Sequence, residues 1–564
     1  MAEHITTTPA RLRTGVAGLD ELLGGGLLAG RTVLLKGSPG SGKTTLGLQI
    51  LIAGATQFNE PGILVTFEQA PEQLYADTAG FGWDLRRLGE EGKVQTVFIE
   101  PEEMIEHRGR QANRLLVNIA DWVDDYGCRR ILIDSISHLS TVFTNEEARA
   151  GFLKFVMQLK SMGLTPIMTA ELDALQGLMG LDAYLVDAVI HLHHEGGSVG
   201  TRERRNLEIL KTRGYQHVGG RHPLEIGRDG IVVFPHTYPA ADAAEAAAAA
   251  PVGADAAPVS TGVHALDLLL SGGYREGSTA LIAGLSGTFK STLAGHFLLG
   301  GGGEAPAPGL WLSFHESTAD LIQSFGWREM DLAGAVESGR VRVMELAPGQ
   351  EPVEKIYYRA AALIAEHGIG RVVIDTLGDL TLGLGRAEEA REAERWFLRR
   401  LKALGVTTLA TQQLVKVTGR NPLSEIGAAE LADTIIYLGL VEIESRLEKV
   451  MSVLKHRGGP VSGDLRAIAC GAGGLQVSER FVGLSGLLDG TARGQRKTQI
   501  EEVFQPLYFI RDFLKMASRP DLDPARRGQM LERLEGETSR VIASLAQYFD
   551  LPLGETDTRK DSKA

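Results

Sequence analysis

Short apolar runs alternate along the chain with longer segments in which apolar residues return every three or four positions. Runs of the first kind occupy residues 32–36, 62–66 and 130–134. They have the length of buried strands, and the segments between them have the periodicity of helices. Strands that alternate with helices form mostly parallel sheets covered by helices. The pattern therefore predicts an α/β fold.

The same pattern occurs twice. The segment Thr14-Gly-Val-Ala-Gly-Leu-Asp20 returns as Thr261-Gly-Val-His-Ala-Leu-Asp267, and a later lysine, Lys43 or Lys290, follows each threonine by 29 positions. Such self-similarity indicates an internal duplication. Four further pairs keep their order: Val65-Thr-Phe-Glu68 with Leu312-Ser-Phe-His315, Phe81-Gly-Trp83 with Phe325-Gly-Trp327, Ile131-Leu-Ile-Asp134 with Val372-Val-Ile-Asp375, and Lys211-Thr-Arg213 with Lys455-His-Arg457.

The two copies predict the domain boundaries. We expect α/β domains at 1–238 and 259–480, joined by a linker at 239–258 whose alanine and proline content offers little to a core. After residue 480 the repeat ends, and 501–517 and 524–550 have helical periodicity. We expect residues 481–564 to form a helical extension, which either packs on its own domain or serves self-association or the docking of a partner.

Composition narrows the class of protein. The formal net charge of −13 opposes a tight, sequence-independent grip on nucleic acid, which depends on Lys and Arg at phosphates. The only two cysteines, Cys128 and Cys470, lack the spacing of a zinc site. The first residues have no apolar segment of signal-peptide type, and no apolar run reaches about 18 residues. These features predict a cytoplasmic protein that does not enter a membrane.

The first copy carries a phosphate-binding loop. Gly37-Ser-Pro-Gly-Ser-Gly-Lys43-Thr44 matches GxxxxGK[ST] between a strand and a helix. Backbone N–H groups would surround the phosphates of ATP, the lysine would reach the β- and γ-phosphates, and the threonine would ligate Mg²⁺. The predicted nucleotide-binding residues are Gly37, Ser38, Gly40, Ser41, Gly42, Lys43, Thr44 and Thr45.

The second copy has a divergent loop. Gly284-Leu-Ser-Gly-Thr-Phe289-Lys290-Ser291 keeps the lysine and the hydroxyl but has Phe289 in place of the last glycine. That side chain either points outward or crowds the nucleotide. We expect ATP here too, with a degenerate structural domain as the alternative. The predicted residues are Gly284, Ser286, Gly287, Thr288, Lys290, Ser291 and Thr292.

Two aspartates are candidates for the magnesium site. Asp134 and Asp375 each end an apolar strand, where a carboxylate holds the hydration shell of Mg²⁺ at the carboxyl edge of the sheet. Thr44 and Ser291 would complete the two metal sites. The alternative is that each aspartate only caps the next helix.

A carboxylate that orients the attacking water is expected at the end of the next strand. Glu68 occupies this position in the first copy and is followed by Gln69. The second copy has His315 followed by Glu316. We therefore predict Glu68 as the main catalytic base and Glu316 as a weaker or reassigned substitute, so that the two sites differ in chemistry.

Together these features resemble the KaiC family of clock-type ATPases and autokinases. The resemblance rests on the tandem copies, Thr-Phe-Glu68, Phe-Gly-Trp, Ile-Asp-Ser and the late Lys-x-Arg-Gly, and runs from about residue 10 to 475. It implies RecA-like domains, with six subunits in a double ring and ATP at subunit interfaces. It further implies that Lys211, Arg213, His217, Lys455 and Arg457 reach a neighbour's nucleotide, and that Trp83 and Trp327 lie near the adenine, unless they are core residues.

The autokinase sites of the family are altered. Its members carry a Ser-Thr pair before an Asp-Thr-Ile strand, and here Ala429-Glu430 precedes Asp433-Thr-Ile. Glu430 places a permanent negative charge where a phosphate would be. We expect no autophosphorylation at the usual positions. Residual serine/threonine kinase activity would need another acceptor, such as Ser424 or Thr434.

The resemblance favours an ATP-hydrolysing signalling or timing protein that assembles with itself into an ATP-dependent homohexamer and binds an unidentified regulatory protein. Its cofactors would be ATP and Mg²⁺. A DNA recombination or repair ATPase is the second hypothesis, because RecA relatives share the same loops; the acidic charge opposes it. The third hypothesis is a scaffold in which ATP only holds the ring together.

Overall fold

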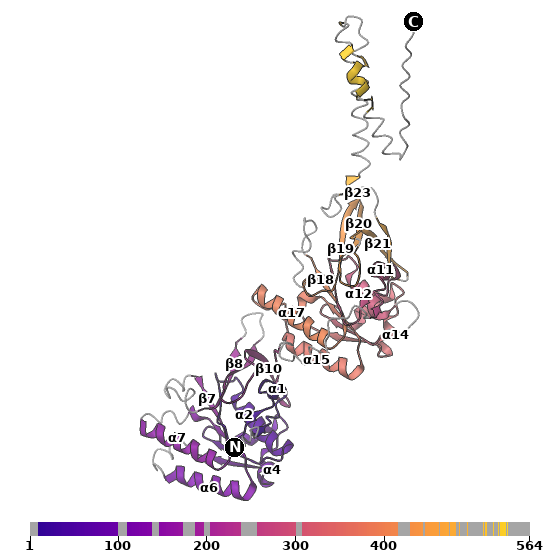
Figure 1. Ribbon diagram of the computed structural model, residues 1–564. Helices are drawn as coiled ribbons and strands as arrows, with labels where there is room; N and C mark the ends of the chain where they lie inside the picture. Colours follow the sequence, from indigo (N-terminus) through magenta and orange to yellow (C-terminus); the bar gives the residue numbers. More distant parts are fainter. Residues whose placement is uncertain are drawn as a thin grey trace, which may run out of the picture. The chain divides into compact units, whose positions relative to one another are not determined.

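A computed structural model describes residues 10–99, 110–137, 146–172, 186–196, 203–237, 257–300, 307–414, 429–443, 446–461, 463–472 and 474–480, with short stretches after residue 483. Contacts divide the chain into two units, Met1–Pro251 with Glu345–Ile369 and Asp379–Gly405, and Val252–Met344 with Gly370–Gly378 and Val406–Ala564. Each contains one large sheet (Figure 1).

The first sheet has nine strands in the order β11-β10-β9-β8-β3-β7-β6-β4-β5. The strands from β8 to β5 are parallel, and β9, β10 and β11 extend the sheet in antiparallel pairs. Their bounds are β3 Val33–Gly37, β4 Gly62–Thr66, β5 Val94–Phe98, β6 Arg130–Asp134, β7 Thr165–Glu171, β8 Ala188–Glu195, β9 Arg204–Thr212, β10 Arg221–Gly227 and β11 Gly230–Val233.

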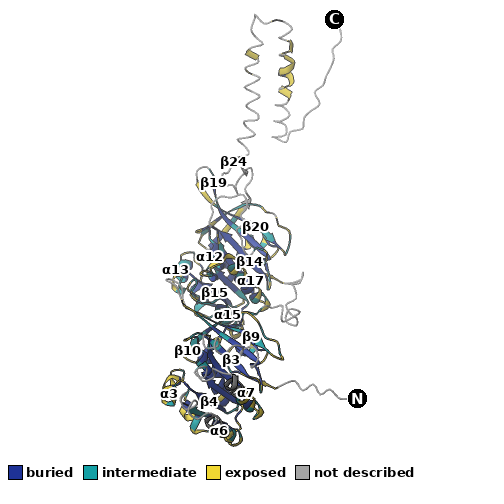
Figure 2. Cartoon of the chain, turned by 90° about the vertical axis from the view of Figure 1, so that its left-hand side faces the viewer, coloured by how far each residue is buried: buried dark blue, intermediate teal, exposed yellow. Residues whose placement is uncertain are grey.

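Helices cover both faces of this sheet. Side chains of α2, α3 and α4 enter one core cluster, and those of α6 and α7 enter another on the opposite face. Figure 1 shows α6 and α7 side by side, and Figure 2 shows the buried strands between the helices. The bounds are α1 Leu19–Leu22, α2 Lys43–Gln57, α3 Pro71–Ala79, α4 Leu85–Glu90, α6 Arg110–Tyr126 and α7 Glu146–Ser161, with short strands β1 Arg11–Leu12 and β2 Leu27–Leu28.

The second sheet repeats the first. Its order is β16-β15-β17-β18-β14-β19-β20-β21-β22. Read from β22 to β16, this order matches that of the first sheet strand for strand, with β14 in the place of β3. The predicted α/β class with two RecA-like domains is thereby confirmed. The bounds are β14 Thr279–Gly284, β15 Gly309–Ser313, β16 Val341–Glu345, β17 Arg371–Asp375, β18 Thr407–Gln413, β19 Thr434–Ile443, β20 Arg446–His456, β21 Arg466–Gly471 and β22 Gly474–Arg480, with short strands β12 Pro258–Val259, β13 Tyr274–Arg275, β23 Leu484–Ser485 and β24 Arg493–Gly494.

The remaining helices follow the same order along the chain. Their bounds are α11 His264–Leu269, α12 Lys290–Leu299, α13 Thr318–Gly326, α14 Leu332–Glu337, α15 Val353–His367, α16 Leu377–Leu380 and α17 Ala387–Ala403. Two of them, α15 and α17, connect strands of the second sheet in the sequence, yet their contacts group them with the first unit.

The linker and the C-terminal extension lie largely outside the described residues. Within the extension, residues 531–536 are helical, and the predicted helical extension as a whole stays a prediction. None of the helices in the described ranges is long and apolar enough to span a membrane.

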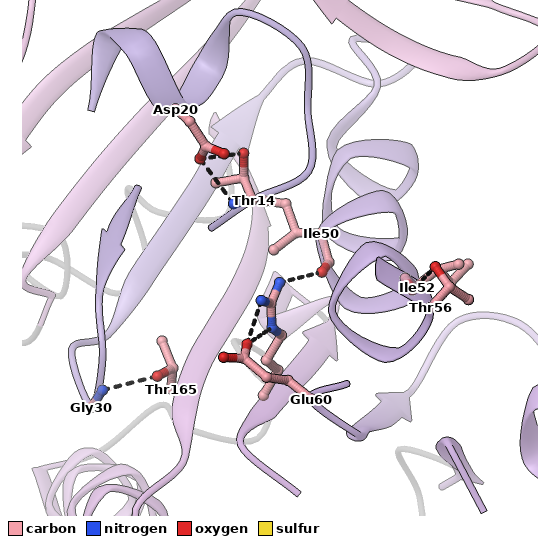
Figure 3. A network of polar contacts seen from close by, with 9 residues as sticks. Thr14, Asp20, Gly30, Ile50, Ile52, Thr56, Glu60 and Thr165 are labelled. Atoms are coloured by element: carbon pink, nitrogen blue, oxygen red, sulfur yellow. Dashed lines mark hydrogen bonds and ion pairs between the residues drawn. The ribbon is translucent and has the colours of Figure 1, made fainter. Parts of the chain in front are cut away.

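The repeated Thr-Gly-Val motif is a side-chain-locked turn. In the first domain both the backbone N and the Oγ1 of Thr14 donate to Asp20 Oδ1, at 2.8 and 2.7 Å (Figure 3). In the second, the backbone N of Thr261 donates to Asp267 Oδ1 at 2.7 Å. Carboxylates that accept such bonds stabilise tight turns. The motif therefore belongs to the fold, where it ties the entry of each domain to its first helix.

A buried arginine joins two elements of the first domain and the loop between α2 and β4. Arg130, fully buried at the start of β6, donates from Nη1 to the carbonyl oxygen of Ile50 in α2 at 2.7 Å and from Nε to Glu60 at 2.9 Å (Figure 3). Arg371, at the start of β17, donates likewise to the carbonyl oxygen of Phe297 in α12 at 2.6 Å. Each arginine thus ties the strand that ends in a candidate metal ligand to the helix that follows the phosphate loop.

We expect Arg130→Ala to destabilise the first domain by about 3 kcal/mol, because it leaves the Glu60 carboxylate without its buried partner. That loss corresponds to a fall of roughly 10 °C in the melting temperature of the domain, measurable by scanning calorimetry. The control is Arg129→Ala, which removes the exposed neighbouring side chain. Equal melting temperatures for the two variants would contradict the structural role of Arg130.

Candidate functional site

The first phosphate loop connects β3 to α2 through two glycines in the left-handed region. Gly40 has φ 74° and Gly42 has φ 100°. A Cβ on Gly42 would lie 2.9 Å from Ile226 Cδ1, so neither conformation nor space favours a larger residue there. Lys43 begins α2, and its Nζ donates to the carbonyl oxygen of Ser38 at 2.9 Å. The Lys43 side chain therefore lies across its own loop, where a phosphate group would bind.

The candidate metal ligands of the first domain meet beside this loop. Thr44 Oγ1 donates to Asp134 Oδ1 at 3.1 Å, and Thr169 on β7 donates to the same oxygen. Asp134 is only 4% exposed, and burial raises the pKa of its carboxyl group. A buried carboxylate next to a hydroxyl at the carboxyl edge of a sheet suits Mg²⁺, whose charge would offset the cost of burial. Asp134 and Thr44 would hold that ion.

The second phosphate loop keeps the same backbone despite its phenylalanine. Gly287 has φ 76° and Phe289 has φ 71°, close to the values at Gly40 and Gly42. Lys290 Nζ donates to the carbonyl oxygen of Leu285 at 2.7 Å. The Phe289 ring packs against the core cluster of the second domain, and Lys449 Nζ lies 3.7 Å from the centre of the ring. The Phe289 ring therefore packs on the protein, and which of the two expected orientations it has toward a bound nucleotide stays a prediction.

Asp375 ends β17 as Asp134 ends β6, and Thr411 on β18 donates to it as Thr169 donates to Asp134. Ser291 follows Lys290 in the first turn of α12. The second domain therefore repeats the carboxylate and its neighbouring threonine. These oxygen ligands suit Mg²⁺, although Asp375 is half-buried where Asp134 is buried.

The two candidate bases differ in their surroundings. Glu68 is exposed two residues after β4, whereas Glu316 is half-buried. The hydroxyls of Thr66 and Ser313 donate to the carbonyl oxygens of Gln69 and Glu316, so Glu316 is the structural counterpart of Gln69, as the sequence predicted. Burial, with the nearby Asp375, raises the pKa of the Glu316 carboxyl group. The acidic group is thus displaced by one residue between the domains.

Lys211 and Arg213, the cations predicted near the end of the first domain, lie at the edge of the sheet where the parallel strands begin, opposite the phosphate loop. Thr212, between Lys211 and Arg213, pairs with Ala188, which pairs with Val33 at the start of β3. The phosphate loop follows Gly37, four residues along the strand or about 13 Å away. Lys211 Nζ donates to the carbonyl oxygen of Val186 at 2.9 Å, and His217 Nδ1 lies 2.7 Å from Thr212 Oγ1.

The second domain has the same arrangement of cations. Lys455 on β20 pairs with Ile435, near the start of β19, and its Nζ donates to the carbonyl oxygen of Ala429 at 2.9 Å. Arg457 Nη1 lies 3.3 Å from Asp433 Oδ1. Within one chain, neither group of cations meets the phosphate loop of its own domain.

The two tryptophans differ from each other. Trp83 packs against the core cluster that contains α2 and stacks on Phe81, with ring centres 4.9 Å apart. Trp327 is 83% exposed. The structure thus places Trp83 against the core, which was the alternative to an adenine contact. The adenine contact of both residues stays a prediction.

Glu171 is a residue near the loop that sequence analysis missed. It ends β7 in register with Gly37, and its charge acts on Lys43 together with those of Asp134 and Glu68. Its counterpart in register with Gly284 is the neutral Gln413. The signal that would have identified Glu171 is its place at the end of the strand next to the loop strand, but strand order cannot be read from periodicity.

The altered autokinase region is only partly described. Glu430 is exposed, and Ser424 lies outside the described residues. Thr434 is buried, with its Oγ1 3.0 Å from His456 Nδ1. A buried, hydrogen-bonded hydroxyl is poorly placed to accept a phosphate in this conformation.

Two RecA-like sheets, each with a strand–loop–helix phosphate cradle and a carboxylate beside it, define a tandem P-loop NTPase. A family model described as "ATPase: KaiC" matches residues 12–238 and again 259–480, more than half of the chain. The chain belongs to the KaiC ATPase family.

Relatives match nearly the whole chain. The circadian clock oscillator protein KaiC of Thermostichus vulcanus is 30% identical over 507 residues, which cover 87% of this chain and 93% of that protein. The KaiC of Picosynechococcus sp. is 29% identical over 501 residues, covering 85% and 92%. The circadian clock protein KaiC2 of Synechocystis sp. is 28% identical over 488 residues, covering 85% and 83%.

We expect Phe289→Gly to leave the affinity of the second domain for ATP unchanged, because the ring packs against the core. The variant relieves about 1–2 kcal/mol of left-handed strain but loses more from the packing of the half-buried ring. Its melting temperature should fall by about 2–4 °C for each net kcal/mol lost. Binding of a fluorescent ATP analogue in a Lys43→Ala background isolates the second site, and tighter binding there would mean that the ring crowds the nucleotide.

Proposed function

We propose that this protein is an ATP-hydrolysing signalling or timing protein that assembles into an ATP-dependent homohexamer, with nucleotides between subunits. Its nucleotide state would control the binding of a regulatory protein in the cytoplasm. ATP and Mg²⁺ are its cofactors in this proposal. The phosphate cradles and the carboxylates beside them, Asp134 buried and Asp375 half-buried, support nucleotide binding. The hexamer rests on membership of the KaiC family.

One observation carries the proposal that assembly is needed. Lys211 and Arg213 lie at the edge of the sheet opposite the phosphate loop of their own chain. A cation placed beside the γ-phosphate stabilises the charge that develops during transfer. Since these cations cannot reach their own nucleotide in this fold, we assign them, with His217, to the nucleotide of a neighbouring subunit.

At the first site, Lys43 would bind the β- and γ-phosphates, and Thr44 and Asp134 would hold the hydrated Mg²⁺. Glu68 would orient the water that attacks the γ-phosphorus and accept its proton. The new bond joins the water oxygen to phosphorus, the bond to the β–γ bridging oxygen breaks, and ADP and phosphate leave. Arg213 from the neighbour would stabilise the charge on the leaving group.

At the second site, Lys290, Ser291 and Asp375 would bind ATP and Mg²⁺ in the same way, and Lys455 and Arg457 would act in trans. Its base would be Glu316, half-buried and one residue displaced. We therefore propose slower turnover there. The buried Thr434 gives no support to a residual autokinase activity.

Mixing two inactive variants tests trans catalysis. The Arg213→Ala variant keeps an intact phosphate loop, and the Lys43→Ala variant keeps an intact Arg213. Each variant alone should lower the turnover of the first site by roughly two orders of magnitude or more. Dissociated and reassembled together, they should regain about a quarter of the wild-type rate, because random assembly pairs an intact loop with an intact arginine at that fraction of interfaces. Steady-state ATPase assays in a Lys290→Ala background measure this rate.

Arg228→Ala, which alters an exposed arginine of the same domain, is the control and should keep full activity. Native mass spectrometry confirms that mixed hexamers form. If the mixture stays inactive in mixed rings, the arginine acts within its own chain and the trans assignment is wrong. Hydrolysis that requires DNA would instead favour the recombinase hypothesis. The scaffold hypothesis would be favoured if the rings form in an ATP-dependent way and Glu68→Gln changes neither their assembly nor their turnover.

The raised pKa of Glu316 predicts different pH profiles for the two sites. A catalytic base must be ionised, and a carboxyl group with a raised pKa is protonated at a higher pH than usual. Acidification should therefore silence the second site before the first. ATPase profiles of Lys43→Ala, which reports the second site, and Lys290→Ala, which reports the first, measure the difference. Coincident acid limbs would show that Glu316 is not the base of the second site.

A further inference from the structure

Two histidines and a glutamate converge on the antiparallel pair β8 and β9 of the first domain. His191 stands opposite Glu208 in the register, and His193 lies two residues further along the same face. One ligand atom from each of the three residues lies within 4.8 Å of the others. His193 Nε2 is 2.8 Å from Glu208 Oε2, and the imidazole ring centres are 3.7 Å apart. All three side chains are half-buried.

We propose that His191, His193 and Glu208 form a binding site for a divalent transition-metal ion of the zinc type. Zn²⁺ takes imidazole nitrogen at about 2.0–2.1 Å and carboxylate oxygen at about 2.0–2.2 Å, which places tetrahedral donors roughly 3.3 Å apart. The present atoms need to move by no more than about 1.5 Å to reach that separation. Two nitrogens and one oxygen suit Zn²⁺ better than Mg²⁺, which prefers oxygen ligands.

Zinc binding at this site depends on the protonation of the three donors and on the charges around them. Metal binding needs neutral imidazole and an ionised carboxylate. Two cations border the site: Lys36 on β3 is in register with His191, and Arg221 Nε lies 3.9 Å from Glu208 Oε2. Both positive charges weaken the attraction of the site for a cation.

The fold itself does not require these three residues. The equivalent positions on β19 and β20 of the second domain, counted from the shared register, hold Tyr437, Gly439 and Ser452. The duplicated sheet therefore forms without the cluster. Three groups with the chemistry of metal ligands on one face of one domain indicate a property that this domain has in addition to its fold.

The site is separate from the proposed Mg²⁺–ATP site. Val189, two residues before His191 on the same face of β8, belongs to the core cluster of α6 and α7, whereas α2 packs on the opposite face. A bound ion would cross-link β8 to β9, the strand that ends with the Lys211–Arg213 cations. Three protein ligands leave a fourth position for water or another donor.

Zinc titration of the full chain tests this proposal. The nucleotide-free protein, stripped with EDTA, is titrated with ZnCl₂ by calorimetry, and metal retained after gel filtration is counted by mass spectrometry. We expect His191→Ala and Glu208→Gln to lose one equivalent of zinc per chain relative to wild type. Zinc should also raise the melting temperature of the wild type and not that of Glu208→Gln. Replacing Zn²⁺ with Co²⁺ should give the visible absorption of a four-coordinate site in wild type alone.

His194→Ala is the matched control. His194 is the next residue along β8, points to the other face and has its Nε2 3.4 Å from Glu203. The His194→Ala variant should still bind the one equivalent of zinc that the ligand variants lose. This result would distinguish the proposed site from zinc binding by other histidines of the chain. Circular dichroism of the metal-free variants checks that they are folded. Equal zinc binding by wild type and folded Glu208→Gln, or equal loss in His194→Ala, would overturn the proposal.

Discussion

Each phosphate loop has to leave a buried strand and enter a helix within a few residues, and this backbone constraint fixes the rest of the site. The turn passes through the left-handed region twice, at Gly40 and Gly42 in the first domain and at Gly287 and Phe289 in the second. The helix then begins at the lysine, whose ammonium group returns to a loop carbonyl. Because β7 and β6 run parallel to β3, Thr169 and Asp134 arrive at the same edge of the sheet. That a phenylalanine adopts the conformation at all shows how strongly the strand and helix dictate it.

The duplication preserved this backbone while the charges around it diverged. The lysine of the first loop is influenced by Glu171, Asp134 and Glu68, and burial nevertheless lowers its pKa. At Lys290 the opposing influence comes from Asp375, since Glu171 is replaced by Gln413. An acidic neighbour competes with the phosphates for the lysine. The two loops thus offer the same N–H groups to a nucleotide in different electrostatic surroundings.

The sequence predicted what is local and repetitive. The strand–loop–helix phosphate motifs, the strand-ending aspartates and the α/β class all follow from periodicity and short motifs, and the structure places them as expected. Contacts between remote segments were not predictable. Glu60 and Arg130 are 70 positions apart and meet only because β4 and β6 are neighbours in the sheet. The orientation of Phe289 and the exposure of Trp327 likewise depend on what packs around them, which no periodic pattern specifies.

The antiparallel extension of each sheet explains why the proposed catalysis needs a second chain. In a purely parallel sheet every strand ends at the carboxyl edge, where the phosphate loop lies. Strand β9 instead runs back along β8, so that Lys211 and Arg213 end near Val33 rather than near Gly37. A parallel strand in that place would have delivered the same cations to the loop of its own chain. The reversal of β9 therefore places the positive charge away from the phosphate loop of its own chain. In the proposed assembly, this charge can interact only with the nucleotide of a neighbouring subunit.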